Sequence, residues 1–318
     1  MEKLVSVIIP TFNEEKYVKS CLSHLAKQTY PNFEVIVSDC DSTDNTAKIA
    51  KKFNVKIENT LIRNRSAACN LALLKAKGDY ILFTDADVDV PKDWIEKYVK
   101  RFSKTDAQVL GAPNVTHFND GFWAEAIGTI KGISSPVYRN GEVIHVPGCN
   151  CAYRKQALEG RKFDKNLLTG EDMDVNLDIV SDGGKIEYAD SPAVFHHRRE
   201  SIRKFARQMY KYGVGYVHLW EKHPELGNKQ LYVSALYLGW VISLPMAFIW
   251  VKPVFLFYVL LTYAFYFKRN FNWLNLKYVL ITPLLGLLQH ICMAFGTIHE
   301  LFMMNVLGRR QTTHRGEK

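Results

Sequence analysis

Three uncharged, apolar runs follow one another toward the carboxyl end of the chain, over residues 231–251, 253–267 and 278–298. The first and third are long enough to cross the hydrocarbon core of a bilayer as helices, and the middle run is short for a span. Buried helices of a soluble core explain one such run, but three in succession favour a membrane. The sequence therefore predicts a membrane region over 231–302 with two to three transmembrane helices, followed by a basic tail over 303–318.

The basic tail leaves the topology open. Three spans would place Arg309, Arg310 and Arg315 outside, against the tendency of basic residues to stay inside. Either the last segment lies partly in the interface, or the middle run does not cross fully. The amino end shows a short strand-like run in place of a secretory signal. We therefore expect an integral protein of the cell membrane whose soluble domain is cytoplasmic.

Charge and cysteine usage narrow the partners further. The net charge is +9, and basic residues crowd near the apolar runs, as over 198–211. This placement favours a membrane surface, and we expect no nucleic-acid partner. A helix around 198–220 has apolar residues at helical spacing, which predicts either an interfacial helix or one packed on the soluble domain. The six cysteines lack the paired spacing of zinc sites, so free thiols are expected.

Residues 1–225 alternate between short apolar strands and amphipathic helices, which predicts an α/β fold with a mostly parallel sheet and helices on both faces. Pro10 is expected to stop the first strand, and Asn13 to cap the helix that follows it. The strands are expected over 5–9, 34–39, 55–58 and 80–83. In such sheets ligands bind outside the carboxyl ends of the strands. Polar residues follow three of these ends, although each also suits a turn.

The alternation fades after residue 107. Strands are expected over 109–112 and 142–146, on either side of a loop that contains Trp123. The small residues of 148–152 indicate either a tight turn or a place where another molecule approaches the backbone. No glycine-rich phosphate loop of the dinucleotide-binding or Walker type is present.

The strand over 80–83 delivers two carboxylates, Asp85 and Asp87, one residue apart. Side chains at i and i+2 of an extended segment share a face, so both can reach one hard divalent cation and leave positions for phosphate oxygens. The alternative is that Asp89 or a neighbour caps the helix after Pro91.

A second acidic group, Glu171 and Asp172, precedes a short apolar helix. Acidic residues in a first helical turn are ordinary stabilisers, so this group alone does not establish a site.

Five motifs in this order resemble the family 2 glycosyltransferases, inverting enzymes of the GT-A nucleotide-sugar fold. The matching segments are Val7–Glu14, Val37–Asp44, Thr84–Asp87, Gly170–Asp172 and, in a relaxed form, Gln208–Tyr212. The resemblance implies an enzyme that moves a sugar from a nucleotide-sugar donor, with Mg²⁺ or Mn²⁺ as its metal. Together with the apolar runs, it implies a lipid-linked acceptor, either a polyprenyl or dolichyl phosphate or a lipid-linked glycan, and contact with membrane lipid.

The resemblance also assigns residues to roles. It implies Asp172 as the catalytic base beside Glu171, and a metal on Asp85 and Asp87. The implied donor-binding residues are Pro10, Thr11, Asn13, Glu14, Asp39, Asp41, Arg65, Asp85, Ala86 and Asp87. The implied acceptor-binding residues are Gly148, Asn150, Gln208, Lys211 and Tyr212.

Two departures from the family pattern bear on function. Cys69 stands where the family usually has arginine, so that contact is expected from Arg63 or Arg65. Lys211 and Tyr212 replace an Arg-Trp pair of the membrane polysaccharide synthases, which argues against processive synthesis because lysine does not reproduce a bidentate arginine. A silent scaffold that binds nucleotide-sugar is the third hypothesis, and the intact acidic motifs count against it.

Overall fold

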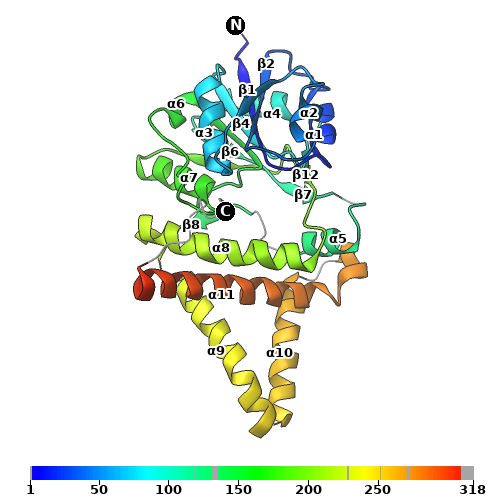
Figure 1. Ribbon diagram of the computed structural model, residues 1–318, viewed down its shortest axis with the longest axis vertical. Coiled ribbons are helices and arrows are strands. Elements are labelled where there is room, and N and C mark those ends of the chain that lie inside the picture. Colours follow the sequence, from blue (N-terminus) through cyan, green and yellow to red (C-terminus); the bar gives the residue numbers. More distant parts are fainter. Residues whose placement is uncertain are drawn as a thin grey trace.

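A nine-stranded sheet forms the centre of the soluble part of this computed structural model, which describes residues 2–117, 119–130, 135–227, 229–250, 252–270 and 273–308. The strands run in the order β3-β2-β1-β4-β10-β6-β11-β9-β8. Below this domain two long helices lie side by side, and a helical hairpin projects from them (Figure 1). The expected α/β class is confirmed.

The amino-terminal half of the sheet is parallel. It consists of β1 (Val5–Thr11), β2 (Phe33–Asp39), β3 (Lys56–Asn59) and β4 (Tyr80–Thr84). Pro10 pairs in register with Ser38 and the strand continues to Thr11, so the expected stop at Pro10 is wrong. The parallel pairing brings the carboxyl ends of β1, β2 and β4 to one edge, where ligands bind in such sheets.

The other half of the sheet contains antiparallel pairs. Strand β10 (Asn150–Arg154) lies antiparallel between β4 and β6 (Val109–Gly111). Of the small residues 148–152, Gly148 and Cys149 form a turn, one of the two alternatives, and the others belong to the strand. The remaining strands are β8 (Val137–Arg139), β9 (Glu142–His145) and β11 (Ile186–Tyr188). A separate sheet, in the order β5-β12-β7, contains β5 (Val88–Asp89), β7 (Asn114–Thr116) and β12 (Val194–His196).

Helices cover both faces of the large sheet because its strands bury side chains on both sides. Val7 and Ile9 face one core and Ile8 faces the other, as the two-residue period of a strand requires. The first core is covered by α1 (Val18–Leu25), α2 (Thr46–Ala50) and α4 (Trp94–Phe102). The second is covered by α3 (Arg65–Lys75), α6 (Lys155–Leu158) and α7 (Glu171–Ser181).

Two local expectations are wrong, and one alternative is excluded. Asn13 does not cap α1; it has a positive φ of 56°, and its Oδ1 accepts a hydrogen bond from the Thr43 backbone N–H at 2.9 Å. The segment around Trp123 is a helix, α5 (Phe122–Gly128), which packs into an apolar cluster with the long helices. Asp89 lies in β5 and caps no helix, since α4 begins only at Trp94.

The two long helices, α8 (Ile202–Lys222) and α11 (Thr282–Leu307), pack along each other over most of their length. Their contact depends on two glycines. A Cβ added at Gly213 would lie 2.0 Å from the carbonyl oxygen of Met293, and one at Gly296 would lie 2.1 Å from that of Tyr210. The absence of side chains there allows the backbones to touch, as small residues do in membrane helix pairs.

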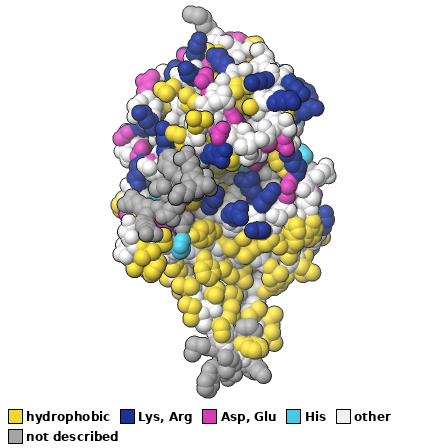
Figure 2. Space-filling view, viewed as in Figure 1, with side chains coloured by type: hydrophobic (Ala, Val, Ile, Leu, Met, Phe, Trp, Pro, Cys, Tyr) yellow, Lys and Arg dark blue, Asp and Glu magenta, His cyan; other side chains and the backbone are white. Residues whose placement is uncertain are grey.

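The first two apolar runs form a hairpin of α9 (Lys229–Trp250) and α10 (Lys252–Asn270), and the turns η1 (Pro224–Leu226) and η2 (Trp273–Tyr278) connect it to α8 and α11. Apolar side chains dominate the lower half of the molecule (Figure 2). In the hairpin, large apolar side chains that are more than half exposed are Tyr232, Leu236, Ile242, Phe248, Leu256, Phe257, Leu260, Leu261 and Phe265. Within the described residues, Thr282–Leu307 is the helix long and apolar enough to cross a membrane.

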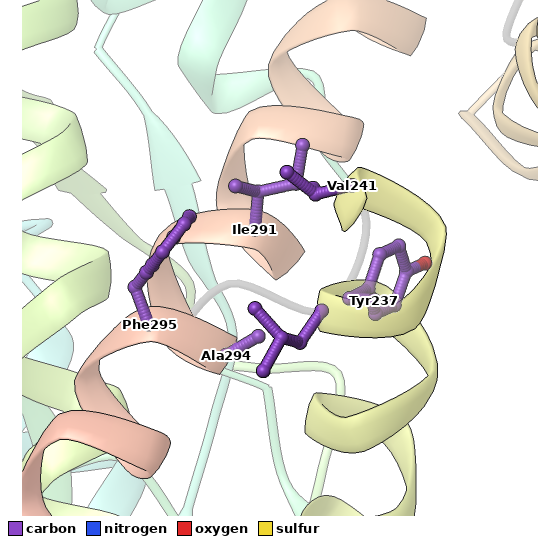
Figure 3. A pocket seen from close by; sticks show the side chains of 6 residues that line it. Tyr237, Val241, Ile291, Ala294 and Phe295 are labelled. Atoms are coloured by element: carbon purple, nitrogen blue, oxygen red, sulfur yellow. The ribbon is translucent and has the colours of Figure 1, made fainter. Parts of the chain in front are cut away.

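A small apolar hollow marks the place where α9 leaves α11. Tyr237 and Val241 of α9 face Ile291, Ala294 and Phe295 of α11 (Figure 3). No charged side chain lines this hollow, so its chemistry does not suit a nucleotide diphosphate.

Candidate active site

The carboxyl ends of β1 and β2 are tied together by Asp39. Its Oδ1 accepts hydrogen bonds from the hydroxyls of Thr11 at 2.8 Å and Ser42 at 2.6 Å, and its Oδ2 accepts one from the Ser42 N–H at 2.9 Å. Asp39 is 3% exposed. A carboxylate has about four acceptor positions, so one position remains for a ring N–H of a nucleotide base.

Four more of the expected donor residues surround this corner. Pro10 lies in β1 beside Ser38, and Asn13 and Asp41 both adopt a positive φ in facing loops. Arg63 forms an ion pair with Asp41 at 2.9 Å and lies over the Phe12 ring. Glu14 stands closer to the metal motif: burial raises its pKa to about 8, and the nearby charges of Asp87 and Asp85 add to this shift.

Arg65 joins the two acidic motifs. It lies in the first turn of α3, and its guanidinium donates to Asp85 Oδ1 at 3.0 Å and to Glu171 Oε1 at 2.8 Å. Between the two alternatives for the missing family arginine, the structure favours Arg65 over Arg63. Cys69 lies one turn along the same helix and is fully buried, and burial raises the pKa of its thiol to about 12. The thiol is therefore neutral and takes no part in the charge network.

Asp172 is held beside this bridge by backbone donors. Its Oδ2 accepts the Gly148 N–H at 2.8 Å, and its Oδ1 accepts the Met173 N–H at 2.8 Å. A Cβ at Gly148 would lie 2.9 Å from Asp172 Oδ2, so the glycine permits this approach. Burial acts to raise the pKa of Asp172, but His145, Arg65 and the two N–H groups outweigh it and lower the pKa. Asp172 is therefore an ionised carboxylate at neutral pH.

Glu171 differs from its neighbour. Burial raises its pKa, the charge of Asp172 adds to that shift, and Arg65 opposes both. Glu171 is 7% exposed and accepts a hydrogen bond from Arg65, whereas Asp172 is partly exposed. Of the pair, Asp172 is the carboxylate with access to a ligand.

Asp87 faces two basic side chains that the sequence interpretation missed. Its Oδ1 lies 3.4 Å from His196 Nε2, and its Oδ2 lies 3.8 Å from Arg199. Burial acts to raise the pKa of Asp87, but His196 and Arg199 lower it to about 2. Arg199 belongs to the basic stretch 198–211 that was assigned to a membrane surface, whereas His196 was given no role. The adjacent histidines His196 and His197 were the missed signal, because imidazole is common in functional sites.

Two carboxylates at this edge are candidate ligands for a divalent cation. Asp85 and Asp87 offer carboxylate oxygens, the ligand type that Mn²⁺ and Mg²⁺ prefer. His196 Nδ1 lies 3.3 Å from the guanidinium of Arg198, which can only donate, so the ring proton lies on Nε2 toward Asp87 and that nitrogen is not free to bind a metal. Ala86 between the two carboxylates is 2% exposed and brings no side chain into the site.

The expected acceptor residues divide into two groups. Asn150 is fully buried: its Oδ1 accepts from Trp94 and Tyr98, and its Nδ2 donates to the carbonyls of Pro113 and Pro192. All its hydrogen-bonding positions are used within the fold, so we reassign Asn150 from acceptor binding to a structural role. Gly148 likewise positions Asp172.

The second group lies on α8. Gln208 donates to the Tyr212 hydroxyl at 3.1 Å, and Lys211 is exposed. Burial raises the pKa of Tyr212, with Asp172 contributing and Arg199 opposing, so this hydroxyl lies near both catalytic motifs and stays protonated. Helix α8 therefore forms the side of the site opposite the sheet edge.

Comparison with known proteins gives a family for this arrangement. Residues 6–161 match the model of glycosyl transferase family 2. A dolichyl N-acetyl-alpha-D-glucosaminyl phosphate 3-beta-D-2,3-diacetamido-2,3-dideoxy-beta-D-glucuronosyltransferase of Methanococcus voltae is 29% identical over 230 residues, which is 66% of this chain and 71% of that protein. The Escherichia coli UDP-Glc:alpha-D-GlcNAc-diphosphoundecaprenol beta-1,3-glucosyltransferase WfgD is 39% identical over 88 residues, 26% of this chain and 35% of that protein.

Among the solved structures that resemble nearly the whole chain is the mannosyltransferase PcManGT of Pyrobaculum calidifontis in complex with GDP-Man and Mn²⁺, with a TM-score of 0.68. The match covers 94% of this chain and 88% of that one, at 18% identity, and so concerns the fold. The sequence match and the shared fold together show that this chain carries a glycosyl transferase family 2 domain on a GT-A-like fold.

Proposed function

We propose that the protein is a membrane-bound, metal-dependent, inverting glycosyltransferase that moves a sugar from a nucleotide-sugar to a lipid-linked acceptor. The observation that carries this proposal is the Arg65 bridge, which holds the metal motif and the base motif on one edge of the sheet. The names of the Methanococcus and Escherichia relatives, which contain dolichyl N-acetyl-alpha-D-glucosaminyl phosphate and alpha-D-GlcNAc-diphosphoundecaprenol, support the lipid-linked class.

The donor is bound along the carboxyl edge. Asp39 accepts a hydrogen bond from the nucleotide base, and Asp85 and Asp87 would hold the divalent cation. When bound, the cation supplies positive charge that stabilises the departing nucleoside diphosphate. Arg65 keeps Asp85 in place, and the guanidinium of Arg199 adds further positive charge beside Asp87 at 3.8 Å.

The acceptor reacts from the opposite side of the sugar. The oxygen of an acceptor hydroxyl attacks the anomeric carbon as the bond to the diphosphate breaks, and Asp172 takes the hydroxyl proton. This single displacement inverts the anomeric carbon. The lowered pKa of Asp172 keeps it ready to accept that proton at neutral pH. If the acceptor is a lipid phosphate, it is already ionised and the site acts by positioning.

The membrane assignment depends on the hairpin. Helices of 22 and 19 residues extend about 33 and 28 Å at 1.5 Å per residue, close to the thickness of a bilayer core of about 30 Å. Helix α11 is apolar enough to span a bilayer, but it packs along α8. The exposed residues of α8 include Arg203, Arg207 and Lys211. Charged groups of that kind do not enter hydrocarbon without high cost. We therefore assign α9 and α10 to the bilayer and α8 and α11 to its interface.

The two-span arrangement agrees with the positive-inside rule. A hairpin returns the chain to the side it came from, so the catalytic domain and the basic tail would share the cytoplasmic face. Lys and Arg side chains gather just above the apolar part of the surface (Figure 2). A reporter fused after residue 318 should be protected from external protease in sealed cells. Cleavage from outside would contradict the two-span topology.

The metal assignment is tested with the purified protein in detergent. We expect excess EDTA to abolish sugar transfer and weaken nucleotide-sugar binding, and Mn²⁺ to restore both. Asp87→Ala should have the same effect without rescue, whereas Asp106→Ala, an exposed acidic residue away from the edge, should have none. Full turnover in excess EDTA would contradict the metal-dependent reaction.

A further inference from the structure

A second group of titratable side chains lies behind the donor edge and has no part in the proposed reaction. Asp89 ends β5, His117 directly follows β7 and His197 directly follows β12, so each strand of the small sheet contributes one residue. The parallel register pairs His196 with Thr116, which places His197 next to His117. Their imidazole rings stack with centroids 4.2 Å apart. Thus His196 faces Asp87, while His197 faces Asp89.

One edge of both rings points at Asp89. Its Oδ2 lies 3.6 Å from His197 Nε2 and 3.8 Å from His117 Nε2. These separations exceed a hydrogen bond. They are close to the roughly 3.4 Å between neighbouring ligand atoms of a tetrahedral zinc ion with bonds of about 2.1 Å.

The other edge of both rings points at Asp120. Both carboxylate oxygens of Asp120 lie 2.8 Å from His197 Nδ1, and one lies 3.5 Å from His117 Nδ1. A carboxylate on one ring nitrogen fixes the proton there and leaves the lone pair on the other, which is how histidine ligands of zinc are commonly oriented. The Nε2 atom of His197 is therefore oriented as a ligand, whereas the contact between Asp120 and His117 Nδ1 is too long to count as a hydrogen bond.

One polar atom that faces the space between these groups is buried and has no hydrogen-bond partner. His197 is 9% exposed and Asp89 is 5% exposed, and His197 Nε2 is a buried atom without a hydrogen-bond partner. Buried polar atoms are rarely left in this state. A second Asp–His group does not show it: Asp174 pairs with His223 at 2.8 Å and with Lys222 at 2.7 Å.

We propose that Asp89, His117 and His197 bind a transition-metal ion, with Zn²⁺ as the best match. Two imidazoles and one carboxylate form a donor set that zinc prefers, and three protein ligands leave the fourth position to water. The divalent charge balances the two carboxylates, Asp89 and Asp120, on either side of the rings. The ion joins the three strands of the small sheet behind the donor edge and is independent of sugar transfer.

The competing interpretation is that His197 is protonated and that no metal ion is bound. Burial acts to lower the pKa of His197, but its contacts with Asp89 and Asp120 outweigh burial and raise it. The groups facing the cluster include His24, 3.3 Å from Asp89 Oδ1, Ser20, which donates to Asp89 Oδ2, and Tyr17, which stacks on His197. A protonated His197 would need no metal, so metal content separates the two interpretations.

The test measures zinc in the full-length protein, purified in detergent, loaded with Zn²⁺ and desalted against a weak chelator. We expect about one zinc per chain by mass spectrometry. His117→Ala and His197→Ala should abolish retention, and Asp120→Asn should weaken zinc affinity about 10- to 100-fold. His24→Ala is the matched control and should retain zinc. Asp87→Ala should lose the donor-site metal but retain zinc, which separates this proposal from the proposed function.

A second measurement uses only the wild-type protein, so it does not depend on whether the variants fold. Wild-type protein loaded with Co²⁺ should show the visible absorption of a tetrahedral site, and equimolar Zn²⁺ should remove it. The proposal is overturned if the wild type takes up no metal beyond the donor site. Retention of zinc by both histidine variants at wild-type affinity would overturn it as well.

Discussion

The acidic edge of the sheet and the layer formed by α8 and α11 are organised by different forces. At the edge, Arg65, Asp85 and Glu171 come from separate elements and meet through charge and hydrogen bonds. In the layer, the contact is made by backbone at Gly213 and Gly296, with apolar side chains around it. Substitutions that change the charge of a side chain at the edge should therefore change the rate of the reaction. Substitutions that add volume in the layer should change the stability of the protein.

The largest expected effect is at the edge. Asp172→Asn keeps the shape of the side chain and removes the proton acceptor. We expect kcat with a hydroxyl acceptor to fall about 10²- to 10⁴-fold with donor affinity nearly unchanged. Asp178→Asn on the same helix, a side chain that is 42% exposed, is the matched control. If Asp172 only stabilised α7, the substitution would cost about 1 kcal/mol of stability and little rate.

The next effect concerns the layer, where we expect a loss of stability in place of a loss of rate. Gly213→Ala places a methyl group against the Met293 carbonyl, and we expect a loss of about 1–3 kcal/mol in unfolding free energy because the helices must separate. Gly239→Ala in α9 meets nothing within 4 Å and should be neutral or stabilising. Thermal unfolding in detergent compares the two. Equal melting temperatures would show that the α8–α11 contact does not limit stability.

A smaller effect is expected at the base-binding corner. Asp39→Asn keeps the shape and one acceptor oxygen, replaces the other oxygen with a donating amide group, and removes the negative charge. The KM of the donor should rise about 10-fold with kcat nearly unchanged, as loss of uniform binding predicts. Steady-state kinetics over a range of donor concentrations measures both. A fall in kcat at unchanged KM would move Asp39 from recognition to catalysis.

The smallest effect is a pH dependence. Glu14 has a pKa of about 8 in the fold because of burial and the charges of Asp87 and Asp85. A raised pKa means that the folded state holds the proton more tightly than the unfolded chain. This contribution is complete below pH 4.5 and is lost as pH rises through 8. Glu14→Gln should therefore raise the melting temperature at pH 9 relative to wild type, with the difference shrinking toward pH 5. A pH-independent difference would contradict the shifted pKa.

The sequence was a good guide to the edge because strand ends fix where side chains go. Asp39, Asp85 and Asp87 follow parallel strands, so their convergence needed only the order of the elements. His196 was missed because its position depends on β12 pairing with β5, a register that adjacent residues do not reveal. Asn150 was misassigned for a related reason: its partners Trp94, Tyr98, Pro113 and Pro192 are distant in sequence.

The sequence was a poorer guide to the layer. An apolar run gives the length and polarity of a helix but not its direction, so three runs indicated up to three spans. The structure instead places the third run along α8 and projects the first two as a hairpin. Gly213 and Gly296 were the available signal, since glycines suit close helix packing. A glycine indicates such a contact only once the helix that packs against it is known.

The central claim is that the edge transfers sugar to a lipid held by the layer. The most direct measurement reconstitutes the purified protein in liposomes that contain polyprenyl phosphate or a lipid-linked glycan, supplies radiolabelled nucleotide-sugars one at a time with Mn²⁺, and follows label into the organic phase. The account predicts that one donor labels the lipid with inverted anomeric configuration, and that Asp87→Ala blocks it. If every donor binds but none labels lipid, while soluble sugar acceptors are labelled, the account of the acceptor is contradicted.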